Sequence, residues 1–151
     1  MSSRIDLDDL DREIIKLLML NSRMSYRKIA ERLGVSPATV LVRLRKLRKK
    51  GVIRGFTVDI DPEKLGFSVQ AYMLIKTDPK KTRNVLIRLS KMDNIVELCE
   101  VTGDYHLLLK VWAEDQKALA NIIDQVRLVD GVVDTNTMLV LRSVKRVTML
   151  V

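Results

Sequence analysis

The sequence predicts an α+β protein of two domains: a helical domain over residues 1–60 and a ferredoxin-like βαββαβ domain over residues 61–151. Apolar residues recur at helical spacing through the first third of the chain, whereas strand-like and helix-like segments alternate in the rest. The charge divides at the same place. Residues 1–55 contain 14 Lys and Arg against six Asp and Glu, and residues 56–151 contain 13 of each. Both changes indicate a domain boundary near residue 60.

Three helices are expected in the first 50 residues. The first covers about residues 7–20 and begins among Asp carboxylates, which suit the positive end of a helix dipole. Ser25 is the expected N-cap of a short second helix, which stops at Gly34. The third helix opens on Ser36 and the proline after it, and it ends at Gly51.

Residues 52–60 follow the third helix and are rich in β-branched and aromatic residues around a central glycine. This composition is typical of a small hairpin or an extended wing. Residues 61–66 contain a proline and a glycine, and we expect them to form a turn or linker between the domains.

The second domain alternates strands and helices in the order β-α-β-β-α-β. A tight turn at Gly103-Asp104 separates its second and third strands. We expect strands at residues 69–76, 95–102, 105–112 and 135–141, helices at 79–92 and 114–128, and a further strand at 144–151.

The predicted strands are apolar on both faces. In the first, Ala71 and Met73 point to one face, and Tyr72 and Leu74 point to the other. Two helices cover only one face of a four-stranded sheet, so the second face needs another cover. We expect a second subunit to bury it, which predicts at least a homodimer.

Residues 26–40 have the spacing of a helix-turn-helix. Ala30 is small where two helices would cross closely, Gly34 supplies the tight turn, and Val40 packs the second helix onto the first. First-turn residues of the second helix would approach base edges, and basic residues further along would contact phosphates. The candidate DNA-contacting residues are Tyr26, Ser36, Ala38, Thr39, Arg43, Arg45, Lys46, Arg48 and Lys50.

The charge of this region supports a nucleic-acid partner. Residues 21–55 contain 11 basic residues and one acid, Glu31. A membrane surface would also attract this charge, but no Trp or Phe anchor occurs before Phe56. The competing structural interpretation is an ordinary three-helix domain with a solvated basic face.

Several other classes of protein are disfavoured. The chain has no Gly-rich phosphate loop, no Cys/His cluster and no supported Ser/His/Asp arrangement, so we expect no enzyme, no cofactor and no metal site. The lone Cys99 and the lone His106 are both expected to be structural. No apolar run approaches the roughly 20 residues of a membrane span, and no signal peptide is evident, which predicts a cytoplasmic protein.

The chain resembles the Lrp/AsnC (feast/famine) family of bacterial and archaeal transcriptional regulators. The resemblance extends over essentially the whole chain in the same order. It is carried by residues 7–15, by Ser36–Val40 followed by Arg43-Leu44, by Leu47 and Gly51-Val52-Ile53, and by Val101–Tyr105.

The resemblance implies a winged helix-turn-helix joined by a hinge strand to a βαββαβ ligand-responsive domain. It also implies dimers that commonly assemble to octamers, with amino acids as effectors bound between subunits. By position, the effector-binding residues would be Gly103, Asp104, Tyr105, Asp115, Thr135 and Thr137. Two departures from many relatives are His106, where an Asp is common, and Arg48, where a Glu is common.

The sequence therefore predicts a sequence-specific DNA-binding transcriptional regulator that responds to an amino acid or related small molecule. Its partners would be double-stranded DNA, the effector and further copies of itself. The alternative is a nucleoid-organising protein that binds DNA with little sequence preference, which the basic surplus also allows.

Overall fold

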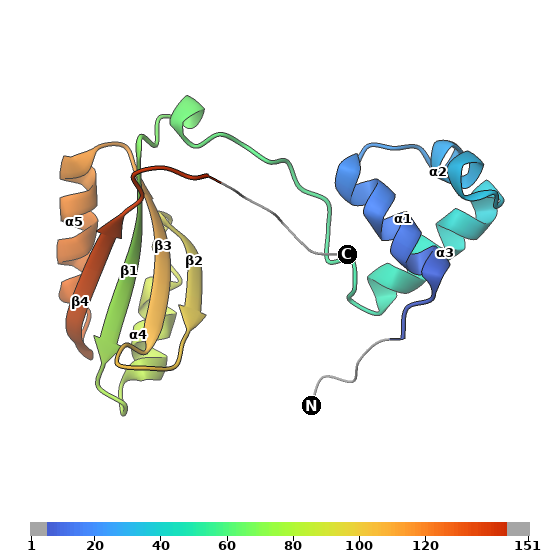
Figure 1. The fold of residues 1–151 in the computed structure, drawn as a ribbon. Coiled ribbons are helices and arrows are strands. Elements are labelled where there is room, and N and C mark those ends of the chain that lie inside the picture. Colours follow the sequence, from blue (N-terminus) through green and yellow to red (C-terminus); the bar gives the residue numbers. More distant parts are fainter. Residues whose placement is uncertain (1–5, 145–151) are drawn as a thin grey trace. The chain divides into compact units, whose positions relative to one another are not determined.

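The computed structural model describes residues 6–144, which divide into two compact units between Asp59 and Ile60. The first unit contains α1 (Asp9–Leu20), α2 (Tyr26–Leu33) and α3 (Pro37–Lys49), in agreement with the three expected helices. Figure 1 shows the three helices, and apolar side chains from all three form one core. It consists of Ile14, Leu18, Met24, Ile29, Ala30, Val40 and Leu44.

The expected hairpin after α3 is absent from the part of the chain that the structure describes. Gly51 adopts φ 71° directly after α3, and residues 54–60 then continue without regular secondary structure. Phe56 and Val58 are exposed along this segment. An extended segment becomes a strand only when a neighbouring strand pairs with it, and no strand of residues 6–144 pairs with this segment.

The second unit has the predicted βαββαβ order, preceded by a short 3-10 helix, η1 (Glu63–Leu65). Its sheet has the antiparallel strand order β2-β3-β1-β4. The elements are β1 (Val69–Thr77), α4 (Thr82–Leu89), β2 (Ile95–Glu100), β3 (Leu107–Ala113), α5 (Gln116–Arg127) and β4 (Val132–Leu139). The strand expected at 144–151 lies, apart from Val144, outside the described residues.

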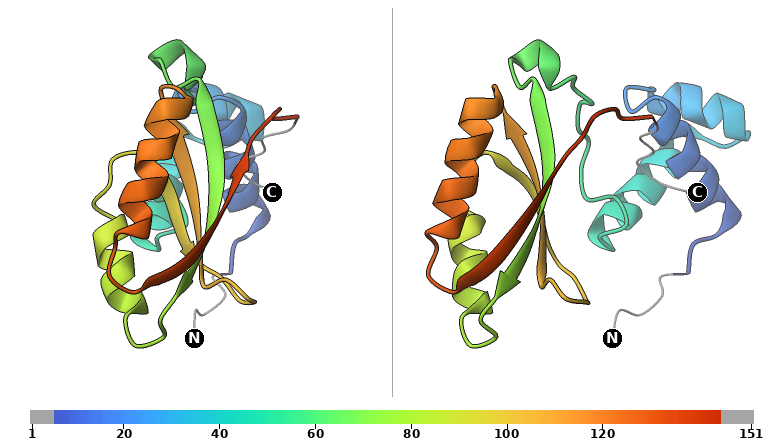
Figure 2. Two further views of the ribbon diagram at one scale, coloured as in Figure 1. Left: turned by 90° about the vertical axis from the view of Figure 1, so that its left-hand side faces the viewer. Right: turned by 60° about the vertical axis from the view of Figure 1, so that its left-hand side comes forward.

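Both helices of this unit lie on the same face of the sheet (Figures 1 and 2). The strand residues that face them, including Ala71, Met73 and Leu109, are fully buried. Tyr72 and Trp112 lie on the opposite face, which is only partly buried. The two faces predicted from the alternation are therefore correct within one copy of the chain. No helix of residues 6–144 is long and apolar enough to cross a membrane.

Candidate DNA interface and effector site

The α2-turn-α3 segment is shaped by side-chain caps and one left-handed glycine. The hydroxyl of Ser25 accepts the backbone N–H of Lys28 at 3.3 Å at the start of α2. Gly34 ends α2 in the left-handed region at φ 65°, which a glycine adopts without steric cost. The Ser36 hydroxyl then accepts the N–H of Thr39 at 3.0 Å and begins α3. The residues predicted to make the turn do make it.

One side of α3 is buried and the other side is exposed. Val40, Leu44 and Leu47 are at most 4% exposed, and Val40 and Leu44 pack into the helical core. Ala30 of α2 is 2% exposed, as expected for a small residue where two helices approach closely. The anchoring stripe leaves the remaining side of α3 available to a partner.

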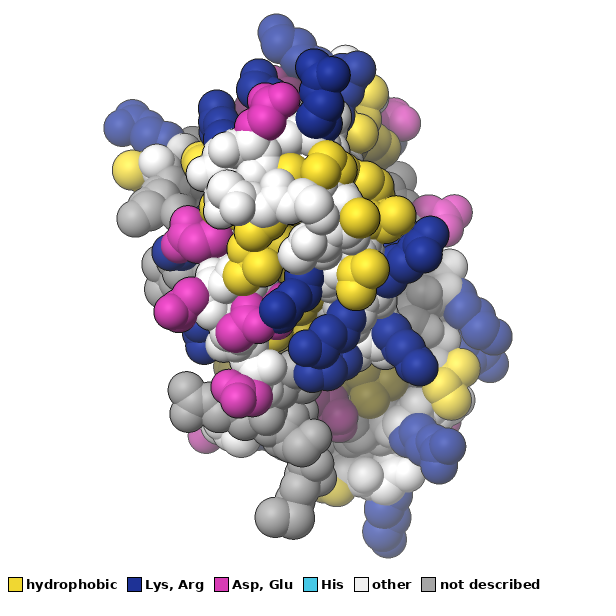
Figure 3. Space-filling view, turned by 90° about the vertical axis from the view of Figure 1, so that its right-hand side faces the viewer, with side chains coloured by type: hydrophobic (Ala, Val, Ile, Leu, Met, Phe, Trp, Pro, Cys, Tyr) yellow, Lys and Arg dark blue, Asp and Glu magenta, His cyan; other side chains and the backbone are white. Residues whose placement is uncertain are grey.

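Most of the predicted DNA-contacting residues lie on that available side. Arg45, Lys46, Arg48 and Lys50 are exposed, and none forms an ion pair within residues 6–144. In Figure 3, Lys and Arg side chains gather below the centre of the face and at its top, and acidic side chains lie toward its left-hand side and also at its top and right.

The predicted base-reading residues lie at the start of α3. Ser36 and Ala38 are exposed, whereas Thr39 is half-buried and its hydroxyl lies 2.8 Å from that of Ser36. Tyr26, at the first position of α2, is 45% exposed. The structure therefore brings the start of α2 and the first turn of α3 to the surface, as the helix-turn-helix spacing predicts.

Arg43 departs from the prediction that it faces outward beside Lys46 and Lys50. Its Nη1 donates to a carboxylate oxygen of Asp8, and it also donates to Oδ1 of Asp11 at 3.3 Å. The Asp11 side chain is only 2% exposed. A buried carboxylate needs a cation beside it, and this requirement turns Arg43 toward α1.

Asp8 combines this ion pair with a cap. Its Oδ1 accepts the backbone N–H of Asp11 at 2.8 Å at the start of α1, while its other oxygen accepts from Arg43. The Asp11 N–H and the Arg43 guanidinium together hold the pKa of Asp8 below its ordinary value of 3.8. The same contact with Asp8 raises the pKa of Arg43.

Three predicted effector residues lie together at one end of the sheet in the second unit. Gly103, at φ 121°, Asp104 and Tyr105 belong to the loop between β2 and β3. Tyr105 reaches the start of β4, where its hydroxyl donates to Oδ2 of Asp134 at 3.4 Å. The register of β1 with β4 places Thr135 opposite Ile75, at this same end of the sheet.

The other predicted effector residues are placed differently. Thr135 accepts a hydrogen bond from Nε of Arg127 at 3.1 Å, which puts its hydroxyl on the side of the sheet covered by α5. Thr137, two residues along, faces the same side. Asp115 caps α5 by accepting the N–H of Ala118 at 2.7 Å.

Asp115 lies at the far end of the sheet from the β2-β3 loop. It follows β3, whose seven residues span roughly 20 Å at about 3.3 Å per residue. One copy of the chain therefore does not bring Asp115 to Gly103, Asp104 and Tyr105, and these residues could share a site only across two subunits.

His106 closes the β2-β3 loop. Its Nδ1 accepts the backbone N–H of Thr77 at 3.1 Å, and its own backbone N–H donates to the carbonyl of Ile75 at 2.9 Å. Nδ1 therefore carries no proton in this arrangement, and Nε2 carries one.

Known proteins match the chain in both units. The family described as winged helix-turn-helix DNA-binding matches residues 7–54. The family described as Lrp/AsnC ligand binding domain matches residues 70–150, more than half of the chain. The chain belongs to the Lrp/AsnC family.

Relatives of this Lrp/AsnC protein agree over nearly their full length. The HTH-type transcriptional regulator FL11 of Pyrococcus horikoshii is 40% identical over 145 residues, which cover 96% of each protein. The structure of Escherichia coli AsnC has a TM-score of 0.91 at 32% identity and covers 96% of this chain and 99% of its own. A Neisseria meningitidis transcriptional regulator in complex with L-Met has a TM-score of 0.87 at 26% identity, with 96% of each chain covered.

This protein is accordingly a DNA-binding transcriptional regulator and not an enzyme. Within residues 6–144, no group of three or more His, Cys, Asp or Glu side chains is arranged to hold a metal ion.

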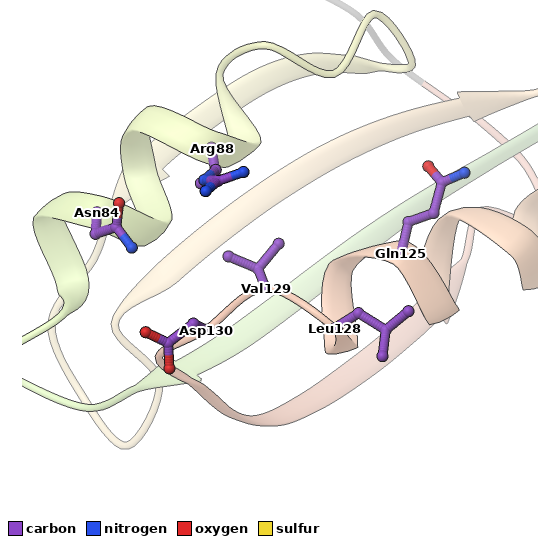
Figure 4. Close-up of a pocket in the computed structure, with 6 residues that line it drawn as sticks. All are labelled: Asn84, Arg88, Gln125, Leu128, Val129 and Asp130. Atoms are coloured by element: carbon purple, nitrogen blue, oxygen red, sulfur yellow. The ribbon is translucent and has the colours of Figure 1, made fainter.

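A shallow hollow of about 300 Å³ lies between α4 and α5 in the ligand-binding domain (Figure 4). It is lined by Asn84, Arg88, Gln125, Leu128, Val129 and Asp130. None of the predicted effector residues lines it, so this hollow is separate from the predicted effector site.

Sequence reasoning missed four side chains that contact the predicted ones. Asp134 and Arg127 meet Tyr105 and Thr135 only through the sheet register, which no local pattern reveals. Asp8 and Asp11 had a usable signal, since a spacing of three places both carboxylates on one side of a helical turn. Of the three residues in this ion-pair cluster, Asp8, Asp11 and Arg43, only Arg43 was among the predicted site residues.

The lowered pKa of Asp8 predicts that part of the stability of the helical domain depends on pH. A carboxylate with a depressed folded-state pKa stabilises the fold above its ordinary pKa, and this contribution is lost as the pH falls through the lowered value. Asp8→Asn keeps a capping side chain but removes the charge. We expect it to unfold at lower urea concentration than the wild type at neutral pH, with a difference that shrinks below pH 3.8 and vanishes once the pH is below the lowered pKa of Asp8.

Far-ultraviolet circular dichroism would follow this unfolding, and fluorescence of Trp112 would report the second unit, whose transition should not move. Asp9→Asn is the matched control, because Asp9 is exposed in the same turn and has no ion pair among residues 6–144. If Asp8→Asn lowered the urea midpoint by the same amount at strongly acidic and at neutral pH, the charge of Asp8 would not be the cause of the lost stability.

Proposed function

We propose that this protein regulates transcription by binding particular DNA sequences through α3, with an amino acid or related small molecule modulating it. The observation that carries the proposal is the row of exposed cations along α3 and at its end, which form no ion pair among residues 6–144 and lie opposite a buried apolar stripe. A helix anchored by its apolar side can enter the major groove of a duplex, with its polar side facing the bases and phosphates.

The roles of the residues follow from their places on the two helices. Ser36, Ala38 and Thr39 are at the first turn of α3, where a helix-turn-helix approaches base edges. The cations further along α3 and Tyr26 at the start of α2 would contact phosphates, which position a protein without reading sequence. The cations assigned this role are Arg45, Lys46, Arg48 and Lys50.

Removing two of these cations should weaken DNA binding and its dependence on salt. For every phosphate that is no longer neutralised, the slope of log affinity against log salt concentration becomes shallower by about 0.9. We expect Lys46→Gln with Lys50→Gln to lower both the affinity and the slope, as measured by fluorescence anisotropy on a labelled duplex over a series of salt concentrations.

The matched control is Arg83→Gln with Lys117→Gln, which removes two exposed cations from α4 and α5. It should leave the slope unchanged. If the α3 pair and the control pair behaved alike, the DNA interface would not lie on α3.

The ligand-binding domain supports assembly and effector binding. The sheet face that carries Tyr72, Leu74, Leu108 and Trp112 is only partly covered in one copy, and a second subunit would bury it. Asp115 lies at the other end of the sheet from the β2-β3 loop. The effector site would then combine Asp115 of one subunit with residues of another, namely Gly103, Asp104, Tyr105, Thr135 and Thr137. We therefore place the effector at subunit interfaces of a homodimer that assembles toward an octamer.

The chemistry of the β2-β3 loop suits an amino acid. The carboxylate of Asp104 can hold an ammonium group, while hydroxyl groups and backbone amides can hold a carboxylate. The related Neisseria meningitidis regulator was found with L-Met, which makes L-Met the first compound to try.

Sedimentation velocity across a panel of amino acids, with and without DNA, tests this part of the proposal. We expect at least one compound to change the sedimentation coefficient or the DNA affinity, because an interface ligand binds the assembled form better. Asp104→Asn should weaken that response, whereas Asp124→Asn, on the exposed side of α5, should keep it. An unchanged profile and affinity for every amino acid would contradict an amino-acid sensor.

A nucleoid-organising protein is the second candidate, because unpaired surface cations attract any duplex. Footprints on a duplex enriched from a randomised pool and on an unrelated duplex at the same salt concentration separate the two functions. A regulator protects a defined segment of the first duplex only, whereas a coating protein protects both uniformly.

A further inference from the structure

The ion pair between α1 and α3 is the only place where a charged side chain is buried among residues 6–144. Asp11 is 1% exposed as a residue, whereas the side chains of Asp8 and Arg43 are 49% and 28% exposed. Asp8 and Arg43 are 35 residues apart in the sequence, so this contact joins the start of α1 to the middle of α3.

Each of the three side chains has a defined task in the cluster. Asp8 caps α1 through one oxygen and accepts from Arg43 through the other. Asp11 offers Oδ1 to the same guanidinium nitrogen, Nη1, at 3.3 Å. Nη1 of Arg43 therefore links the first turn of α1 to one turn of α3, in addition to the apolar contacts between the two helices.

The position of Arg43 within α3 explains how its ion pair with Asp8 and Asp11 can affect DNA reading. Arg43 directly precedes the buried Leu44, and it lies four and five residues after Thr39 and Ala38. Apolar packing is non-directional and tolerates small rotations of a helix, whereas a charge-assisted hydrogen bond has a preferred direction. The ion pair can therefore fix how α3 is rotated about its axis, and with it the side that Ala38 and Thr39 present.

The charges around Arg43 also distinguish it from its neighbours. Two carboxylates already balance its charge, so a phosphate group would have to displace them before it gained anything. Lys46 has no ion pair within the described part of the chain and is exposed. Arg43 and Lys46 are thus both basic residues of one helix, with different local electrostatics.

We propose that Arg43 is a positioning residue that orients the DNA-reading turn of α3 through Asp8 and Asp11, instead of neutralising a phosphate. This inference rests on the function proposed above. It predicts that discrimination between sequences, and not the number of phosphates neutralised, depends on the cluster.

The test compares Arg43→Gln with Lys46→Gln on a duplex enriched from a randomised pool and on an unrelated duplex, over a series of salt concentrations. Arg43→Gln should lower the ratio of the two affinities on the order of tenfold, comparable with the loss of one read base pair, and leave the salt slope unchanged. Lys46→Gln should weaken both duplexes alike and lower the slope by about 0.9. A slope lowered by Arg43→Gln would overturn the proposal.

A second variant guards against misfolding, because Arg43→Gln leaves Asp11 buried without a cation. The double variant D8N/D11N removes both acids and keeps the capping group at position 8. If Arg43 were a phosphate contact held back by these acids, D8N/D11N would tighten binding to both duplexes and keep their ratio. If Arg43 is instead a positioning residue, D8N/D11N should lower the ratio of the two affinities, because Arg43 has lost its partners. Arg43→Lys keeps a cation beside the two acids and should therefore retain part of the ratio.

These outcomes are separable from failure of the proposed function. If the wild type enriched no preferred duplex, sequence-specific regulation itself would fail, whatever the variants did. If the wild type were specific and D8N/D11N left the affinity ratio unchanged, the positioning role alone would be overturned. Circular dichroism of each variant would confirm that helix content equals that of the wild type.

Discussion

One-sided burial of α3 is the constraint on which the DNA-binding part of the molecule depends. Val40 and Leu44 belong to the helical core and Leu47 is also fully buried, so their side of α3 is closed to any partner. Exposed cations then occupy most of the other side. Because the stripe is buried within one copy of the chain, this presentation of α3 requires neither ligand nor partner.

The same kind of constraint acts on the sheet. Helices α4 and α5 cover one face, where strand residues such as Met73 and Leu109 are fully buried. The other face carries apolar side chains that one copy of the chain leaves partly exposed. A helix with one free side is suited to a groove, and a sheet with one free face is suited to another subunit. In the proposed function, the two units thus divide DNA binding from assembly.

Local chemistry explains why much of this could be predicted from the sequence. Caps such as Ser36, the left-handed Gly34 and period-two apolar strands depend on neighbouring residues alone. The orientation of Arg43 could not be predicted from the charge count, because its partners lie more than 30 residues away. Of the two forms predicted after α3, a hairpin or an extended wing, the hairpin did not form because a strand needs a pairing partner. The separation of Asp115 from the β2-β3 loop, at opposite ends of the sheet, became evident only from the way the strands are connected.

Dimethyl sulphate protection of a duplex enriched from a randomised pool tests most directly whether α3 lies in the major groove. Guanine N7 faces the major groove and adenine N3 the minor groove, so the reagent distinguishes the two. We predict protection of guanines in two half-sites about 10 base pairs apart, and its disappearance in Ala38→Glu. Protection confined to adenine N3, or guanine protection that persists in Ala38→Glu, would contradict the placement of α3.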